Sequence, residues 1–336
     1  YKGYEITSVF FGGGTPSILM ETQIAEIMEA LQQNFFIRKE AEITIECNPG
    51  TLAHQKIITY KESGINRISM GLQSTNNREL KMLGRIHTYE EFLHNYDLVR
   101  KSGIENVNVD LMSALPGQTV SDWERTLKEI LKLRPEHISA YSLIIEEGTP
   151  FYQTYEEDEQ RREEGEEPKY LPNEETEREM YRLTGALLKE KGYMQYEISN
   201  YAKKGRECQH NIGYWTRKNY LGLGLGSASL VENVRFFNTS DLQEYLAGDF
   251  EEREREVLER REQMEEFMFL GLRMIKGVSR GDFKKAFGVE IEAVYGEVIK
   301  KMVSQGLLQQ QAGRIFLTEE GISVSNYVMS EFLLKI

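Results

Sequence analysis

The segment that decides the fold reads Val9-Phe10-Phe11-Gly12-Gly13-Gly14-Thr15-Pro16-Ser17. It passes from an apolar stretch, typical of a strand, into three consecutive glycines and then into a region of helical periodicity. Because glycine has no Cβ, such a turn lets the backbone come within hydrogen-bonding distance of a ligand. The N–H groups at the start of the following helix favour an anionic group there. On the glycines alone, a tight strand-to-helix turn and a ligand site are equally good interpretations.

Length and composition describe a globular chain and exclude several classes of function. The 336 residues are 28% charged and 40% hydrophobic, with a formal net charge of −13. This charge argues against a general affinity for nucleic acid or for anionic membranes. No apolar run approaches the roughly 20 residues that span a bilayer. The two cysteines, Cys47 and Cys208, predict no disulfide framework and favour the reducing cytoplasm.

Apolar runs alternate with helical periods through the first half of the chain. Five strands are predicted, over Ile6–Phe11, Ile43–Cys47, Arg67–Leu72, Val107–Leu111 and Ile138–Ile145. A helical period follows each of the first four strands, so parallel strands joined by right-handed crossovers are expected. The economical interpretation is an α/β barrel or partial barrel, and a doubly wound sheet is the alternative.

The second half of the chain departs from this alternation. Residues 156–179 are strongly acidic with few apolar anchors, which favours a solvated loop and helix start over an acidic binding site. The Glu/Arg-rich residues 251–266 predict the start of an amphipathic helix. Two helices, a hairpin around Gly313 and a terminal helix follow, in the order of a winged-helix module. We therefore predict three domains, covering residues 1–200, 201–250 and 251–336.

Polar residues follow the predicted parallel strands at the points where they end. Glycines 12–14 follow the first strand, Glu46 ends the second, Gln73 follows the third and Asp110 the fourth. In parallel β/α barrels these carboxyl ends meet on one rim, and a buried carboxylate there needs a cation or donor. We expect Arg85 to reach the same rim from its loop and to contact a carboxylate or a ribose oxygen. A zwitterionic ligand with an amine, a carboxylate and a ribose would suit this set.

Four of these motifs together resemble a known family. They are Phe11–Ser17, Glu46-Cys-Asn-Pro49, Gly71-Leu-Gln-Ser74 and Asp110-Leu-Met-Ser-Ala-Leu-Pro-Gly117. They are similar to the radical S-adenosylmethionine (SAM) enzymes of the oxygen-independent coproporphyrinogen III oxidase group, and most similar to its haem chaperone branch. The resemblance extends over essentially the whole chain. It implies a partial (β/α)6-type barrel followed by a C-terminal α+β winged-helix-like domain.

The resemblance also assigns residues to SAM. It implies that Gly13 and Glu46 contact the methionine end of the molecule. Five further residues match positions that hold a second SAM in the related oxidase: Gly14, Thr15, Gln73, Arg85 and Asp110. All seven are expected in the SAM pocket, with no division between two sites.

One family element has no counterpart in this sequence. The family holds a [4Fe–4S] cluster with a Cys-x3-Cys-x2-Cys loop after the first barrel strand, and this chain has no such triplet. The chain begins with Tyr1-Lys2-Gly3-Tyr4, at what would be the second barrel strand. We therefore expect the first β/α unit to be missing and this chain to contain no metal ligands. A cluster is expected only when the missing segment is present.

A second constellation is His210-Asn211-Ile212-Gly213-Tyr214-Trp215. An imidazole can ligate haem iron, with Cys208 as an alternative thiolate, and an aromatic pair offers a flat apolar surface. From the residues alone, a core histidine beside packed aromatic side chains is favoured. The segment resembles the HNxxYW element of the haem chaperone branch, and this implies that His210, Asn211, Tyr214 and Trp215 handle haem.

The resemblance implies a cytoplasmic haem chaperone that binds haem and SAM without decarboxylase activity. It would deliver haem to acceptors such as membrane-associated respiratory proteins, and a homodimer is possible. The alternative is an oxygen-independent coproporphyrinogen III oxidase. A nicotinamide-dependent dehydrogenase is a remote alternative, because the glycines of residues 222–227 lack the dinucleotide spacing. Tight backbone packing is the favoured interpretation of those glycines.

Overall fold

The computed structural model describes residues 3–334. The chain divides into two compact units. The first contains Tyr1–Gln195 and Ser199–His210, and the second contains Tyr196–Ile198 and Asn211–Ile336. The three-part division at residues 200 and 250 stays a prediction. No helix within residues 3–334 is long and apolar enough to cross a membrane.

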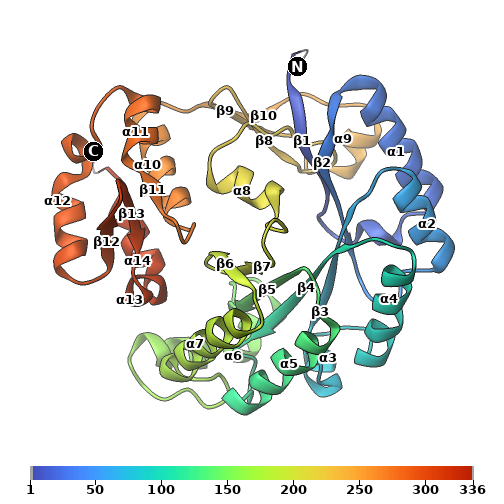
Figure 1. The fold of residues 1–336 in the computed structure, drawn as a ribbon, viewed down its shortest axis with the longest axis horizontal. Coiled ribbons are helices and arrows are strands. Elements are labelled where there is room, and N and C mark those ends of the chain that lie inside the picture. The colour runs from blue at the N-terminus through green and yellow to red at the C-terminus, as the bar shows by residue number, and fades with distance from the viewer. Residues whose placement is uncertain (1–2, 335–336) are drawn as a thin grey trace. The chain divides into compact units, whose positions relative to one another are not determined.

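The first unit is built on a curled sheet that forms a half-barrel (Figure 1). Its strands lie in the order β1-β2-β3-β4-β5-β7-β6. They are β1 (Glu5–Phe11), β2 (Phe36–Cys47), β3 (Arg67–Gln73), β4 (Asn106–Ser113), β5 (His137–Ser142), β6 (Met194–Glu197) and β7 (Asn200–Ala202). A boundary between the units falls within β6, after Gln195. Neighbouring strands from β1 to β5 are parallel, and β7 pairs antiparallel with β5. The predicted partial α/β barrel is therefore confirmed.

Helices on the outer, convex face cover this sheet (Figure 1). The helical segments are η1 (Pro16–Ile18), α1 (Glu21–Asn34), α2 (His54–Glu62), α3 (Asn77–Met82), α4 (Tyr89–Lys101), α5 (Val120–Leu133), α6 (Pro150–Glu163) and α7 (Glu174–Glu190). Threonines begin α4 and α5, where Thr88 and Thr119 accept hydrogen bonds from backbone N–H groups of the first turn. The buried Trp123 ring of α5 donates to the Thr184 hydroxyl of α7 at 2.8 Å, which fixes these two helices against each other.

The strands alternate between an apolar face under the helices and a polar face inside the half-barrel. In β3, Ile68, Met70 and Leu72 are fully buried in the hydrophobic core. Side chains point to opposite faces every second residue, so Ser69 and Gln73 face the other way. The parallel register places Glu46 beside Ser69, and Ser69 beside Asn108. A row of polar side chains therefore crosses the inner face.

The acidic segment after β5 is more ordered than predicted. A solvated loop and a helix start were predicted for residues 156–179. The loop is wrong for residues 156–163, which belong to α6, whereas α7 does begin within the segment, at Glu174. Thr149 caps the helix and Pro150 occupies its first turn. Asp158 is only 2% exposed, and its carboxylate accepts bonds from the backbone N–H groups of residues 169–171 at 2.8, 2.6 and 2.9 Å. Hydrogen bonds to the Asp158 carboxylate, and not an apolar helix face, therefore hold this segment in place.

A boundary between the units falls within α8 (Gln209–Trp215), after His210, and a small antiparallel sheet follows in the second unit. The sheet and the helix beside it consist of β8 (Ala228–Val231), β9 (Val234–Phe237), β10 (Arg253–Val257) and α9 (Leu242–Leu246). Residues 253–257 form a strand where a helix was predicted, because they pair with β9 and their alternating charges suit an exposed edge. The predicted tight packing is present at Gly222, where a Cβ would lie 2.3 Å from the Ala228 carbonyl oxygen.

The rest of the second unit has the predicted winged-helix order. It comprises α10 (Arg260–Gly271), β11 (Val278–Ser279), α11 (Arg280–Phe287), α12 (Ile291–Ser304), β12 (Leu308–Gln311), β13 (Arg314–Leu317), α13 (Glu319–Ser323) and α14 (Ser325–Ser330). Its core is apolar and aromatic, with Phe283, Tyr295 and Phe332 fully buried. The buried Glu266 of α10 pairs with Arg217 at 2.7 Å and with Arg235. This ion-paired carboxylate connects the helix to the segment that follows α8.

Candidate functional site

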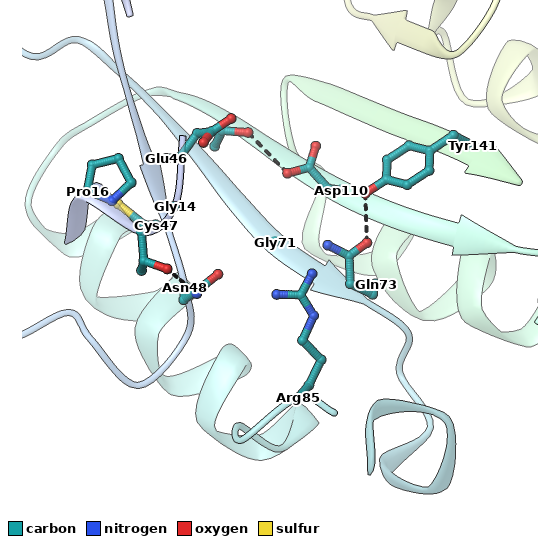
Figure 2. A pocket seen from close by; sticks show the side chains of 12 residues that line it. Gly14, Pro16, Glu46, Cys47, Asn48, Gly71, Gln73, Arg85, Asp110 and Tyr141 are labelled. Carbon is teal, nitrogen blue, oxygen red and sulfur yellow. Dashed lines mark hydrogen bonds between the residues drawn. The ribbon is translucent and has the colours of Figure 1, made fainter. Parts of the chain in front are cut away.

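A cavity of about 280 Å³ opens at the carboxyl ends of the parallel strands (Figure 2). Its lining comes from all five parallel strands and the loops that follow them: Gly14, Thr15, Pro16, Glu46, Cys47, Asn48, Ser69, Gly71, Gln73, Arg85, Asp110 and Tyr141. Seven residues were predicted to form the SAM pocket, and six of them line this cavity. The seventh, Gly13, hydrogen-bonds through its backbone to Glu46.

The glycine turn brings backbone polar groups to the cavity. Gly13 and Gly14 have φ angles of +75° and +54°, a conformation that side-chain-bearing residues rarely adopt. The turn is held from the other side, because the Asn48 amide donates to the Thr15 hydroxyl at 3.2 Å. Gly13 and Gly14 are therefore required by the conformation of the turn.

Glu46 is half-buried beside the turn at the end of β2. Burial and the nearby Asp110 charge raise the pKa of Glu46, while the bond from Gly13 opposes this rise. Two carboxylates that repel each other in one cavity favour a cationic or donor-rich ligand. A ligand ammonium group is one such partner.

Asp110, in the second half of β4, is oriented by a polar network. Its carboxylate accepts from the Asn108 amide at 2.7 Å and from the Ser69 hydroxyl at 3.3 Å. The Asn108 oxygen lies 2.6 Å from Nδ1 of the buried His137. Burial raises the pKa of Asp110, and the bonds from Asn108 and the charge of Arg67 oppose that rise. Asn108 therefore acts on both sides of the network and fixes the direction of the Asp110 carboxylate.

Gln73 and Tyr141 form the side of the cavity opposite the glycine turn (Figure 2). Gln73 is buried with a φ of +74°, and its side-chain oxygen accepts from the Tyr141 hydroxyl at 2.9 Å. Burial raises the pKa of Tyr141 to about 12, so the hydroxyl remains a donor at neutral pH. Tyr141 was missed by the sequence reasoning. The predicted fifth strand ended at Ile145, whereas β5 ends at Ser142, so the argument from strand ends did not lead to Tyr141.

Arg85 reaches the cavity from the loop between α3 and α4, and Figure 2 shows its guanidinium directed toward the interior. Its backbone N–H bonds to the Leu80 carbonyl at 2.9 Å, which holds the loop at the end of α3. Among the described residues, no carboxylate pairs with this guanidinium. The cavity thus combines two carboxylates with one cation that has no protein anion, which suits a zwitterion.

The predicted haem residues all lie on α8, and the boundary between the units falls between His210 and Asn211. His210 stacks on Phe10 with ring centroids 4.5 Å apart. Burial lowers the pKa of His210 to about 4. In the second unit, the Trp215 ring lies 4.4 Å from the Arg273 guanidinium carbon, and Tyr214 packs edge-on against Tyr220.

The two cysteines do not fit an iron–sulfur cluster. Both are buried, and burial raises the pKa of the Cys47 thiol. Cys208 donates to the Glu42 carboxylate at 3.5 Å. Within residues 3–334, no group of three or more His, Cys, Asp or Glu side chains could hold a metal ion. A [4Fe–4S] cluster requires three or four thiolates, more than these two cysteines supply.

Residues 1–130 match the Radical SAM superfamily, and residues 258–324 match the HemN C-terminal domain. The heme chaperone HemW of Lactococcus lactis is 36% identical over 339 residues, covering 99% of this chain and 87% of the relative. The heme chaperone HemW of Bacillus subtilis is 33% identical over 334 residues, covering 98% and 86%. The solved structure of HemN from Escherichia coli, described as a coproporphyrinogen III oxidase and radical SAM enzyme, has a TM-score of 0.81. That match covers 99% of this chain and 79% of the other at 20% identity, which shows a common fold. On the identity to these relatives along nearly its whole length, the chain belongs to the HemW family of radical SAM proteins.

Proposed function

We propose that this protein is a haem chaperone that binds haem and SAM and delivers haem to acceptor proteins. The observation that carries this proposal is the match to HemW relatives over 98–99% of the chain. That match includes the α8 segment as well as the half-barrel. The proposed acceptors are membrane-associated respiratory proteins, and the proposed location is the cytoplasm.

The cavity at the strand ends is the proposed SAM site. Glu46 would accept hydrogen bonds from the ligand ammonium, and Arg85 would pair with the ligand carboxylate. Asp110 would accept from ribose hydroxyls, while Gln73 and the backbone around Gly13 bind the remaining polar atoms. Gly14 and Thr15 complete the proposed set. The radical SAM family also implies a [4Fe–4S] cluster, for which Cys47 and Cys208 do not suffice.

The proposed haem contacts are on α8. A pKa of about 4 leaves His210 neutral at pH 7, and the neutral imidazole is the form that ligates iron. Tyr214 and Trp215 offer aromatic surface for a porphyrin face, and Asn211 offers an amide for a polar edge. When bound, haem supplies an iron whose axial position an imidazole can occupy.

Haem titration followed at the Soret band tests the haem assignment. We expect His210→Ala to lower haem stoichiometry or to shift the Soret maximum. His94→Ala is a matched control, because this histidine is exposed on α4. If His210→Ala keeps the wild-type spectrum and stoichiometry, His210 has no role in haem binding.

Calorimetric titration with SAM tests the cavity. Loss of a charge-assisted bond to the ligand costs about 1.5–3 kcal/mol, so Arg85→Gln should weaken SAM binding by tenfold or more. Arg78→Gln is the control, because Arg78 is exposed on α3. Equal SAM affinity of Arg85→Gln and the wild type would exclude the proposed ion pair.

Oxidative decarboxylation of coproporphyrinogen III is the second candidate, because the fold is shared with HemN. Anaerobic incubation of the reconstituted protein with coproporphyrinogen III and SAM distinguishes the two. Decarboxylated product would contradict a chaperone without enzymatic activity. A homodimer is also proposed, and sedimentation of the protein with and without haem measures it.

A further inference from the structure

A buried carboxylate from β2 holds the beginning of α8. Glu42 is 9% exposed on the inner face of the half-barrel. Its Oε1 accepts from the His210 backbone N–H at 3.1 Å and from the Cys208 thiol at 3.5 Å. Its Oε2 accepts from the Gln209 backbone N–H at 3.1 Å. Three donors from one short segment therefore converge on one carboxylate, and all of these residues belong to the first unit.

The imidazole ring of His210 is held by the neighbouring strand. It stacks on Phe10 of β1 with an interplanar angle of 16°, and its Nδ1 lies 3.5 Å from the Ser8 hydroxyl. The register pairs Ser8 with Glu42 across β1 and β2. Ser8 and Phe10 share one face, because they are two residues apart on a strand. One strand thus fixes the backbone of His210 and the adjacent strand fixes its ring.

We propose that Glu42 and Phe10 are positioning residues that set the place and ring orientation of His210 for haem binding. The inference rests on the proposed haem role of His210. Neither residue needs to touch haem, since both act through the histidine. The groups that orient a metal-ligating histidine usually alter metal affinity by 10- to 100-fold when they are changed.

Glu42→Gln tests the backbone anchor with little change in shape. The amide NH2 cannot accept, so one of the two backbone N–H groups loses its partner. We expect haem affinity to fall about tenfold or more, with a shifted or broadened Soret band and SAM affinity within about twofold of the wild type. Glu40→Gln on the same strand is the matched control, because Glu40 is exposed. If Glu42→Gln has the haem affinity and the Soret spectrum of the wild type, Glu42 does not position His210 for haem binding.

Phe10→Leu tests the ring contact, and it provides a second variant if Glu42→Gln does not fold. Leucine keeps apolar volume but removes the flat surface on which the imidazole stacks. We therefore expect a changed Soret spectrum together with only a small loss of stability. Amide hydrogen exchange gives a readout without haem, because Glu42→Gln should accelerate exchange at Gln209 or His210, whichever amide loses its acceptor. Unchanged exchange at both amides would overturn the proposal. If His210→Ala binds haem as the wild type does, the proposed haem role of His210 is wrong. If His210→Ala loses haem binding but Glu42→Gln and Phe10→Leu both keep it, only the positioning role of Glu42 and Phe10 is wrong.

Discussion

Replacement of Gly12 by alanine tests how tightly the glycine turn is packed. The φ angle of Gly12 lies outside the left-handed region, so alanine meets no backbone strain there. Its Cβ would lie 2.6 Å from Cε1 and 2.9 Å from Cδ1 of Phe10, and 3.3 Å from Oε2 of Glu46. Carbon atoms prefer a separation of about 3.5–4.0 Å. The overlap with the ring is therefore about 1 Å.

The Phe10 ring has little room to yield, because the imidazole of His210 stacks on it at 4.5 Å. Forcing an extra carbon into a packed site costs about 1–3 kcal/mol, and we expect the upper half of that range here. Urea unfolding followed by tryptophan fluorescence measures the loss of stability, and calorimetric titration measures SAM affinity. Because the new methyl group also crowds Glu46, SAM binding should weaken together with stability.

Gly185→Ala provides the opposite expectation from the same chemical change. Gly185 lies inside α7, and a Cβ there meets nothing within 4 Å. Alanine should therefore stabilise the protein by about 0.5–1 kcal/mol. If Gly12→Ala is as stable as the wild type and binds SAM equally well, the packing of the turn has been misjudged.

Three further changes follow from buried carboxylates. Burial and the Asp110 charge raise the pKa of Glu46, so the folded state binds a proton more readily than the unfolded state. The free energy of unfolding should therefore fall as pH rises above the usual glutamate pKa. Glu46→Gln should reduce this pH dependence, measured by urea unfolding, and should also weaken SAM binding. An unchanged slope would contradict this. Although burial acts to raise it, three backbone bonds hold the pKa of Asp158 low, so its stabilisation should be lost as pH falls below the usual aspartate pKa. Asp158→Asn should cost about 1–3 kcal/mol at neutral pH, and a loss below half of that would indicate compensation by solvent. Glu266→Ala leaves Arg217 without its carboxylate and Arg235 with only Glu256 at 3.8 Å, and it should cost about 3–5 kcal/mol in thermal unfolding. Loss of an exposed pair such as Lys300–Glu297 should be barely measurable.

The parallel core was predictable because its strands are apolar runs separated by helical periods. The two errors of secondary structure share a cause, since α6 and β10 are rich in charge and bury little apolar surface. In α6 the decisive group is Asp158, whose partners follow 11–13 residues later in the chain. In β10 the decisive event is pairing with β9. Neither interaction leaves an apolar period in the sequence.

The rim of the site was predictable because carboxyl ends of parallel strands meet. The supporting network on the inner face was missed, although its signal is present as polar residues at every second position. Ser69 and Gln73 alternate with core residues in β3, as Asn108 and Asp110 do in β4. The contact between Glu42 and His210 is different, because 168 residues separate the two in the chain. No local pattern encodes such a contact.

Several features inside the half-barrel are unfavourable in the protein by itself. Glu46 has a raised pKa, Gln73 has a left-handed backbone, and the Nε of the buried Arg67 has no hydrogen-bond partner among the described residues. Such local costs collect at ligand sites, where bound groups offset them. Of these residues, Glu46 also lies close to the glycine turn and the Phe10 ring, since a Cβ at Gly12 would meet both side chains, and His210 stacks on that ring.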